Sequence, residues 1–357
     1  MKKVAIVGIQ GLPANYGGFE TMVENIIGEN SSEGIEYFVY CSSKDMGNNK
    51  LKEHKGAKLR YVNMKSHGIW CVPYYFTSMM RCIGKGYDTV LVLGCGGGFA
   101  LPIYKLFSKA RIIVNIDGLE HRRDKWGKIA KWLLKTLEIF SVRFSDVIVA
   151  DNVGIQDYVT DNYGKKSEMI AYGGDTVLRD ISAEMCDTFL EKYNLQKKSY
   201  AISVCRIEPE NNCHITLEAY SKSKRNLVFI GNWERSEYGR SLKERFSEFP
   251  NIKILDPIYD LDTLYALRSN AEVYIHGHSA GGTNPSLVEA MFFGIPIYAF
   301  DCVYNIESTC HQANYYHTAD DLLKLLEKMP QNGDAMKVLA YERYTWKKIA
   351  MQYEAIY

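Results

Sequence analysis

The sequence predicts an α/β protein of two domains, each built on a parallel sheet covered by helices. Short apolar runs alternate with helix-length segments along most of the chain, which is the order of elements in such a fold. One glycine-rich loop follows the first apolar run, and a second follows the run that ends at Ile275. The 357 residues also allow two separate cores.

Composition is that of an ordinary globular protein, with 46% apolar residues, 24% charged residues and a formal charge of +1. This charge gives no signature of a nucleic-acid partner. Apolar runs of about 18 residues are absent, and the start MKKVAIVGIQGLP becomes polar too early for a signal peptide, so we expect a cytoplasmic protein. The nine cysteines form no CxxC pair, and we expect reduced thiols.

The first apolar run, residues 4–9, leads through a glycine-rich loop into a predicted helix that begins near Phe19. Gly17 and Gly18 would let the backbone approach a ligand before this helix, although a tight turn without a ligand is the alternative. The loop lacks the GxGxxG pattern, so it supports a dinucleotide site only weakly. Further strands are expected at 36–41, 58–64, 88–94 and 110–118.

Two loops of this first half are candidates for function. The GCGGG segment at 94–98 ends a strand and is interpreted as a structural turn rather than a sugar site. Asp117 ends the strand 110–118, where open parallel sheets bind ligands. Glu120 and His121 follow on the same loop, so a carboxylate and an imidazole are available for acid–base chemistry, unless this segment only caps the next helix.

Residues 125–144 are predicted to form an amphipathic helix with basic residues on its polar side. Its apolar stripe would face its own domain and its lysines an anionic membrane, while simple burial of one face is the alternative. The apolar residues at helical spacing are Trp126, Ile129, Ala130, Leu133, Leu137, Phe140 and Phe144. The residues expected to face the membrane are Arg122, Arg123, Lys128, Lys131 and Lys135.

The second half opens after the turn IAYGGDT, residues 170–176, and its first strand ends at Arg206. The guanidinium of Arg206 could hold a diphosphate, or it could be solvated or paired with an acid. More strands are expected at 226–232, 251–258 and 295–301, and helices at 319–328 and 333–357. Either Asp260 or Asp262 is interpreted as the cap of the helix that follows, so no metal is expected.

The stretch HGHSAGGTNPSLVEAMFFG, residues 276–294, combines a strand end, a loop and a helix that begins at Pro285. Backbone N–H groups of the loop and first turn would be free to bind a diphosphate. Glu289 would accept hydrogen bonds from a ribose, or only interact with the helix dipole. The residues expected to bind the donor are Gly17, Gly18, Arg206, Asn211, Gly281, Gly282, Thr283, Asn284, Ser286, Leu287 and Glu289.

Two segments carry a resemblance to a known family. PSLVEAMFFGIPI (285–297) resembles the nucleotide-sugar signature of retaining GT-B glycosyltransferases of family 4, and GIQGLPANYGGFET (8–21) resembles bacterial rhamnosyltransferases that build cell-surface polysaccharides. The family usually has two glutamates eight positions apart, of which Glu289 matches the second and Gly281 replaces the first. Asn211 stands in place of a diphosphate-binding lysine, and Asp117 in place of a sugar-contacting histidine.

The resemblance implies two Rossmann-like domains facing a central cleft, 1–177 and 178–335, with a helix at 336–357 crossing back to the first. It implies transfer of L-rhamnose from dTDP-L-rhamnose to a polyprenyl-diphosphate-linked saccharide at the inner face of the cytoplasmic membrane. The catalytic candidates are Arg206, Asp117 and His121, with no metal or other cofactor. The alternatives are a UDP- or GDP-hexose donor, a nucleotide-sugar epimerase, and a non-catalytic nucleotide-binding scaffold.

Overall fold

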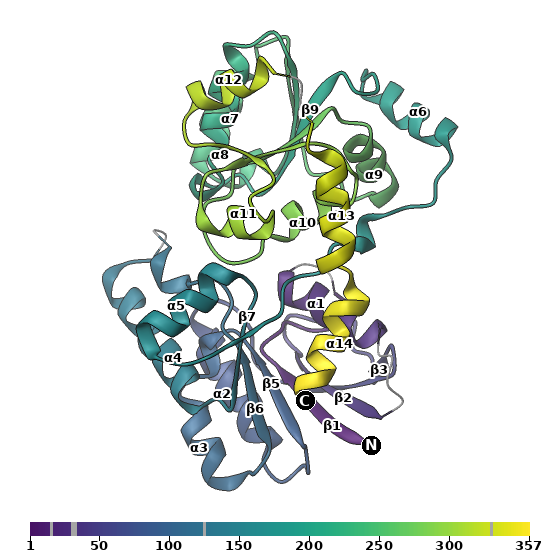
Figure 1. Ribbon diagram of the computed structural model, residues 1–357. Helices are drawn as coiled ribbons and strands as arrows, with labels where there is room; N and C mark the ends of the chain where they lie inside the picture. Colours follow the sequence, from purple (N-terminus) through teal and green to yellow (C-terminus); the bar gives the residue numbers. More distant parts are fainter. Residues whose placement is uncertain (15–16, 30–33, 124–125, 329–330) are drawn as a thin grey trace. The chain divides into compact units, whose positions relative to one another are not determined.

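The computed structural model describes residues 1–14, 17–29, 34–123, 126–328 and 331–357. The chain forms two compact units. In Figure 1 the colour follows the sequence from purple at the N-terminus to yellow at the C-terminus. The first unit comprises Met1–Tyr172 and Trp346–Tyr357, and the second comprises Gly173–Thr345. Each is an α/β unit with its own parallel sheet, as the alternation of apolar runs and helix-length segments predicted.

The first unit contains an eight-stranded sheet with the order β3-β4-β2-β1-β5-β6-β7-β8. All neighbouring strands are parallel except β3 and β4. The strands are β1 Lys2–Val7, β2 Ile35–Ser42, β3 Glu53–His54, β4 Ala57–Val62, β5 Thr89–Leu93, β6 Arg111–Asn115, β7 Val147–Ala150 and β8 Glu168–Met169. The central strands are buried on both faces, which explains their nearly continuous apolar sequence.

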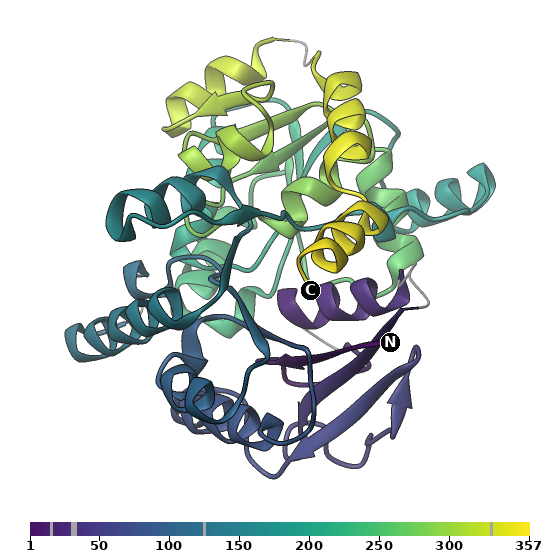
Figure 2. The ribbon, with the colours of Figure 1, turned by 60° about the horizontal axis from the view of Figure 1, so that its bottom comes forward.

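Helices cover this sheet, and the last helix of the chain belongs to the same unit. They are α1 Gly18–Gly28, α2 Cys71–Cys82, α3 Ala100–Phe107, α4 Lys128–Phe144, α5 Val153–Tyr163 and α14 Trp346–Ile356, with 3-10 turns η1 Gly68–Trp70, η2 Cys95–Gly97 and η3 Glu120–Arg122. Helix α14 lies beside α1 (Figure 2). It is anchored by a 2.7 Å hydrogen bond from Asn115 to the Tyr353 hydroxyl and by the rings of Tyr172 and Trp346, 4.7 Å apart.

The second unit contains a six-stranded, fully parallel sheet with the order β11-β10-β9-β12-β13-β14. The strands are β9 Tyr200–Val204, β10 Asn226–Ile230, β11 Ile252–Leu255, β12 Val273–His276, β13 Ile297–Phe300 and β14 Asn314–Tyr316. The helices are α6 Ala183–Lys192, α7 Cys213–Ser221, α8 Glu237–Phe246, α9 Leu261–Ser269, α10 Pro285–Met291, α11 Val303–Ser308, α12 Ala319–Leu326 and α13 Gly333–Arg343, with η4 Asp175–Val177, η5 Pro209–Asn211 and η6 Trp233–Arg235. Asp260 caps α9 through Thr263, as predicted.

The C-terminal region differs from the single helix expected over 333–357. Helix α13 ends at Arg343, and α14 begins at Trp346. At the break, the carbonyl of Tyr344 accepts a 2.8 Å hydrogen bond from the N–H of Gly174. The Tyr344 carbonyl therefore accepts its hydrogen bond from the start of the second unit and not from a further turn of the helix. The second unit ends at Thr345, whereas residue 335 was the expected boundary.

Candidate functional site

In the second unit, the order of strands reverses between β9 and β12. The chain adds β10 and β11 on one side of β9 and then returns to place β12 on the other side. Open parallel sheets bind ligands beyond the carboxyl ends of the strands at such a reversal. Arg206 follows β9, and the glycine loop around Gly281 follows β12, so the fold brings these two predicted segments to the same edge of the sheet.

The side chain of Arg206 is 45% exposed, and one guanidinium nitrogen lies 3.7 Å from the carboxylate of Glu208. An exposed pair at this distance contributes little to stability. The guanidinium can therefore leave Glu208 for a stronger acceptor such as a diphosphate at small cost.

Asn211 is buried, and both ends of its side-chain amide make contacts within the protein. Its Nδ2 donates to the carbonyl of Arg206 at 2.7 Å, and its Oδ1 lies 2.7 Å from Nδ1 of His278. Because Nδ2 must face the carbonyl, Oδ1 is an acceptor and Nδ1 of His278 carries a proton. Asn211 thus joins the segment of Arg206 to the loop that follows β12.

The first turn of α10 is capped from within the chain. Pro285 occupies the first helical position, as predicted, and Asn284 is the N-cap. However, the N–H of Ser286 donates to Oδ1 of Asn284 at 3.0 Å, and the N–H of Leu287 donates to its carbonyl at 3.1 Å. The prediction that these two N–H groups are free for an anion is therefore wrong, because Asn284 satisfies both.

The loop before α10 retains two glycine N–H groups as candidate donors, those of Gly281 and Gly282. Gly281 has φ +88°, in the region that favours glycine. Thr283, also expected at the donor site, is buried. The backbone part of the predicted anion site thus loses Ser286 and Leu287 and keeps Gly281 and Gly282.

Glu289 lies on α10, and its Oε2 is 2.9 Å from Nη1 of Arg268 on α9. The Glu289 side chain is 25% exposed, whereas that of Arg268 is 3% exposed. Arg268 was not among the predicted site residues; the signal for it is a single cation in the mainly apolar stretch YALRSNAEVYI. The ion pair leaves part of the Glu289 carboxylate at the surface of the site.

His276 ends β12 and is buried. Burial, helped by the neighbouring His278, holds the pKa of His276 well below its usual value of 6.5. The imidazole is therefore neutral in the native protein near pH 7.

We expect this burial to make the stability of the protein depend on pH. Below about pH 6.5 the unfolded chain protonates His276 and the native state does not, so stability falls as the pH falls, by up to about 1.4 kcal/mol per pH unit. Between pH 7 and 5.5 the advantage of the wild type over His276→Asn should shrink by about 1 kcal/mol in urea unfolding. A difference that is independent of pH would contradict this assignment.

In the first unit, the strand order reverses between β1 and β5, where the two glycine loops of this half lie. Tyr75 donates its hydroxyl to the carbonyls of Gly8, at 3.1 Å, and Leu93. A Cβ on Gly96 would lie 2.8 Å from the Tyr75 ring. The GCGGG segment therefore makes room for a buried ring, in agreement with its interpretation as a structural turn.

Gly17 and Gly18 also make close contacts within the protein. A Cβ on Gly17 would lie 1.9 Å from the carboxylate of Glu20, which accepts a 2.7 Å hydrogen bond from the N–H of Gln10. The carbonyl of Gly18 accepts from the Tyr172 hydroxyl at 3.0 Å. These contacts favour the alternative of a tight turn over an approach to a ligand.

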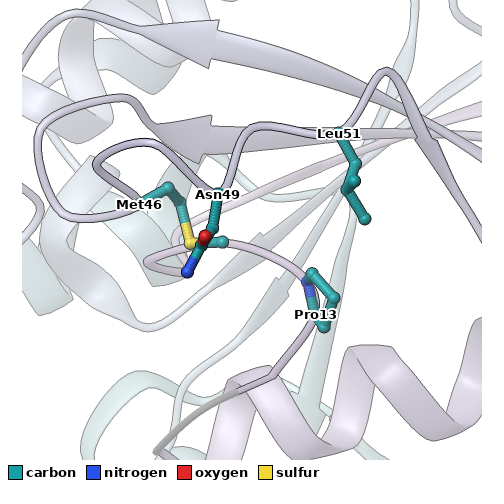
Figure 3. Close-up of a pocket in the computed structure, with 4 residues that line it drawn as sticks. All are labelled: Pro13, Met46, Asn49 and Leu51. Atoms are coloured by element: carbon teal, nitrogen blue, oxygen red, sulfur yellow. The ribbon is translucent and has the colours of Figure 1, made fainter.

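Figure 3 shows a pocket of about 270 Å³ beside this loop, lined by Pro13, Met46, Asn49 and Leu51. A Cβ on Gly11 would lie 2.6 Å from the sulfur of Met46, so the glycine is required for this packing. The lining residues carry no charge. The pocket therefore lacks the cations that a diphosphate site needs.

His121 is paired with a carboxylate that the sequence analysis did not consider. Its Nδ1 lies 2.8 Å from Oε2 of Glu138 on α4, and burial lowers the pKa of His121 although Glu138 opposes this effect. Glu120 is occupied elsewhere, by Trp126 at 2.9 Å and by Arg123 at 3.0 Å. Asp117 has φ +60°, and its N–H donates to the Asn115 side chain.

Glu138 is the centre of a buried polar cluster in the first unit. It accepts hydrogen bonds from Tyr158, Tyr163 and Lys135, and although burial alone would raise its pKa, these bonds hold the pKa below its usual value. Lys135 was expected to face a membrane; its ammonium donates to this cluster, and its side chain is 34% exposed. The guanidinium of Arg122 stacks on the Tyr158 ring at 4.6 Å.

Helix α4 exposes part of its apolar stripe. Leu137 is buried, but Ile129 is 85% exposed and Leu133 is 37% exposed. Trp132, which is not part of this stripe, is 69% exposed. The expectation of an inward stripe is therefore wrong at Ile129 and Leu133, which are exposed. Lys128 is exposed and Lys131 half-buried on this helix, while Lys125 lies outside the described residues.

Three further observations concern the described part of the chain. No helix there is both long and apolar enough to cross a membrane. No group of three His, Cys, Asp or Glu side chains in these residues could hold a metal ion. All nine cysteines are free thiols.

Comparison with known proteins gives two family matches. Residues 1–175 match a domain of unknown function (DUF1972), and residues 187–344 match the glycosyl transferases group 1. No curated protein matches the chain.

Solved structures share the fold over the whole length. Sucrose-phosphate synthase from Thermosynechococcus elongatus has a TM-score of 0.81 at 12% identity, covering 100% of this chain and 98% of its own. HepE of Anabaena in complex with UDP has a TM-score of 0.77 at 12% identity, covering 100% and 99%. A glycosyltransferase from Rickettsia africae has a TM-score of 0.75 at 13% identity, covering 99% and 97%. At these identities the structures show a common fold of two Rossmann-like domains.

Proposed function

We propose that this chain, a GT-B glycosyltransferase that uses a nucleotide-sugar donor, transfers L-rhamnose from dTDP-L-rhamnose to a polyprenyl-diphosphate-linked saccharide. One observation carries the donor-binding part of the proposal. Arg206 after β9, the glycine loop after β12 and Glu289 on α10 belong to the strand reversal of the second unit. This edge offers a cation, backbone donors and a carboxylate, which match the diphosphate and the pentose of a nucleotide.

In the proposed reaction, the acceptor hydroxyl oxygen bonds to C1 of the sugar while the bond from C1 to the diphosphate oxygen breaks. Arg206 and the N–H groups of Gly281 and Gly282 stabilise the charge that develops on the leaving diphosphate. The resemblance implies attack on the same face, with the proton passing to that diphosphate. The first unit would bind the acceptor, where Asp117 and His121 stay candidates for contact with the reacting sugar.

Nucleotide binding tests the proposal at its first step. A ligand that binds only the native state raises the melting temperature by mass action. We expect dTDP to stabilise the protein more than UDP, GDP or NAD does in a thermal-shift series. A preference for UDP or GDP would replace the rhamnose donor by another hexose donor, and no response to any nucleotide would favour a scaffold.

We further propose that the protein lies peripherally on the cytoplasmic face of an anionic membrane. Support comes from the exposed Ile129 and Trp132 beside Lys128 on α4, a combination that suits the boundary between lipid headgroups and acyl chains. A lipid-linked acceptor would be reached from such a position.

Replacing Ile129 and Trp132 together by serine should reduce sedimentation with anionic vesicles by at least about tenfold, because both apolar side chains would leave the lipid. Lys128→Gln with Lys131→Gln should weaken the same binding and reduce its dependence on salt. Val338→Ser, at an exposed valine on α13, is the matched control. Unchanged sedimentation of both double variants would reject the membrane surface.

A further inference from the structure

In the ion pair between Arg268 and Glu289, one carboxylate oxygen of Glu289 already accepts a hydrogen bond from the arginine. Nη1 of Arg268 is 2.9 Å from Oε2 of Glu289, and its Nη2 donates to the carbonyl of Ser286 at 3.3 Å. The guanidinium also lies 5.0 Å from the ring centre of Phe293 and 5.9 Å from that of Tyr274. Arg268 is thus fixed by contacts on several sides.

Burial makes this pair obligatory. A buried guanidinium cannot lose its proton, and it is stable only beside an ionised partner. With Arg268 only 2% exposed, Oε2 of Glu289 faces the protein interior. Oε1 is the oxygen left for a ligand on the partly exposed side of the carboxylate.

We infer that Arg268 is a positioning residue that turns Glu289 to present one oxygen, so that the site recognises the pentose of the nucleotide through a single hydroxyl. The inference rests on the proposed function, in which Glu289 contacts the pentose. A 2′-deoxyribose diphosphate carries only the 3′-hydroxyl, so this is the hydroxyl that Glu289 binds. The site would accept ribose and 2′-deoxyribose almost equally.

Three thymine nucleotides share the base and the diphosphate and differ only in whether the pentose carries its 2′- and 3′-hydroxyls. They are ribothymidine diphosphate, dTDP and 2′,3′-dideoxythymidine diphosphate, and their Kd values can be measured by calorimetry. We expect ribothymidine diphosphate and dTDP to bind within threefold of each other, and loss of the 3′-hydroxyl to weaken binding about tenfold or more. A ribothymidine preference above threefold, or a dideoxy penalty below threefold, would overturn the inference.

Variants separate a positioning role from a purely structural one. Arg268→Met should reduce the dideoxy penalty to below threefold because Glu289 is no longer held, and Arg268→Lys should restore part of it. A structural arginine would instead weaken all three ligands by one common factor, which contradicts positioning. If Arg268→Met does not fold, the ligand series on the wild type still decides the single-hydroxyl contact, and Arg268→Lys decides the role of the arginine.

Glu289→Gln distinguishes failure of this inference from failure of the proposed function. In one combination of results, Glu289→Gln weakens dTDP binding while the wild type binds ribothymidine diphosphate more than threefold better than dTDP. This combination would support the contact between Glu289 and the pentose and reject the contact through a single hydroxyl. If Glu289→Gln leaves the Kd of dTDP unchanged, the pentose role of Glu289 itself is rejected.

Discussion

Replacing Arg206 with alanine is expected to lower kcat/KM for glycosyl transfer by about 10- to 150-fold. The estimate corresponds to the loss of one charge-assisted contact to the leaving diphosphate, about 1.5–3 kcal/mol. Little stability should be lost, because the guanidinium is 45% exposed and its pair with Glu208 is weak.

The matched control is Arg240→Ala, at an exposed arginine on α8. Both variants remove the same charge from the second unit, so a difference in turnover reports the position of Arg206 rather than the net charge. A rate for Arg206→Ala close to that of Arg240→Ala would remove Arg206 from the site.

Replacing Gly277 with alanine should destabilise the protein by about 3 kcal/mol, the upper part of the usual range for overpacking. The added Cβ would lie 2.2 Å from the carbonyl oxygen of Asn211, a backbone atom that cannot rotate away. Relief of this clash requires the segment that carries Arg206 to move away from β12, so donor binding should weaken as well.

Thermal unfolding provides the measurement, with an expected fall of roughly 6–12 °C for a domain of this size. Gly34→Ala is the control, because a Cβ there meets no atom within 4 Å. A melting temperature for Gly277→Ala equal to that of the control would show that the end of β12 and the Arg206 segment are not packed as described.

Much of the fold can be predicted from the sequence because buried parallel strands need continuous apolar runs. The runs at 36–41, 58–64, 88–94 and 110–118 became β2, β4, β5 and β6. The break between α13 and α14 was not predicted, because it depends on a hydrogen bond between Tyr344 and the distant Gly174.

The candidate site was predicted less completely, for a related reason. Local pattern identifies Pro285 and Asn284 at the start of a helix, but not the two N–H groups that Asn284 occupies. The partners Arg268 and Glu138 come from other elements and meet Glu289 and His121 only in the folded chain. Buried polar groups must be paired, but the sequence alone does not say with which group.

The face that α4 presents to solvent was also not fully predicted from the sequence. The spacing of its apolar residues predicts that one stripe is buried, and this holds for Leu137 but not for Ile129. In the folded chain Lys135 donates to Glu138, while Trp132 is 69% exposed.

Transfer of labelled sugar from dTDP-L-rhamnose to polyprenyl-diphosphate-linked saccharides measures the proposed reaction itself. We predict that label appears in the lipid fraction with release of an equal amount of dTDP, and that UDP-glucose and GDP-mannose give much less product. Conversion of the donor without any acceptor would indicate an epimerase instead. No transfer from any of the three donors, by a protein that binds dTDP, would contradict the central claim.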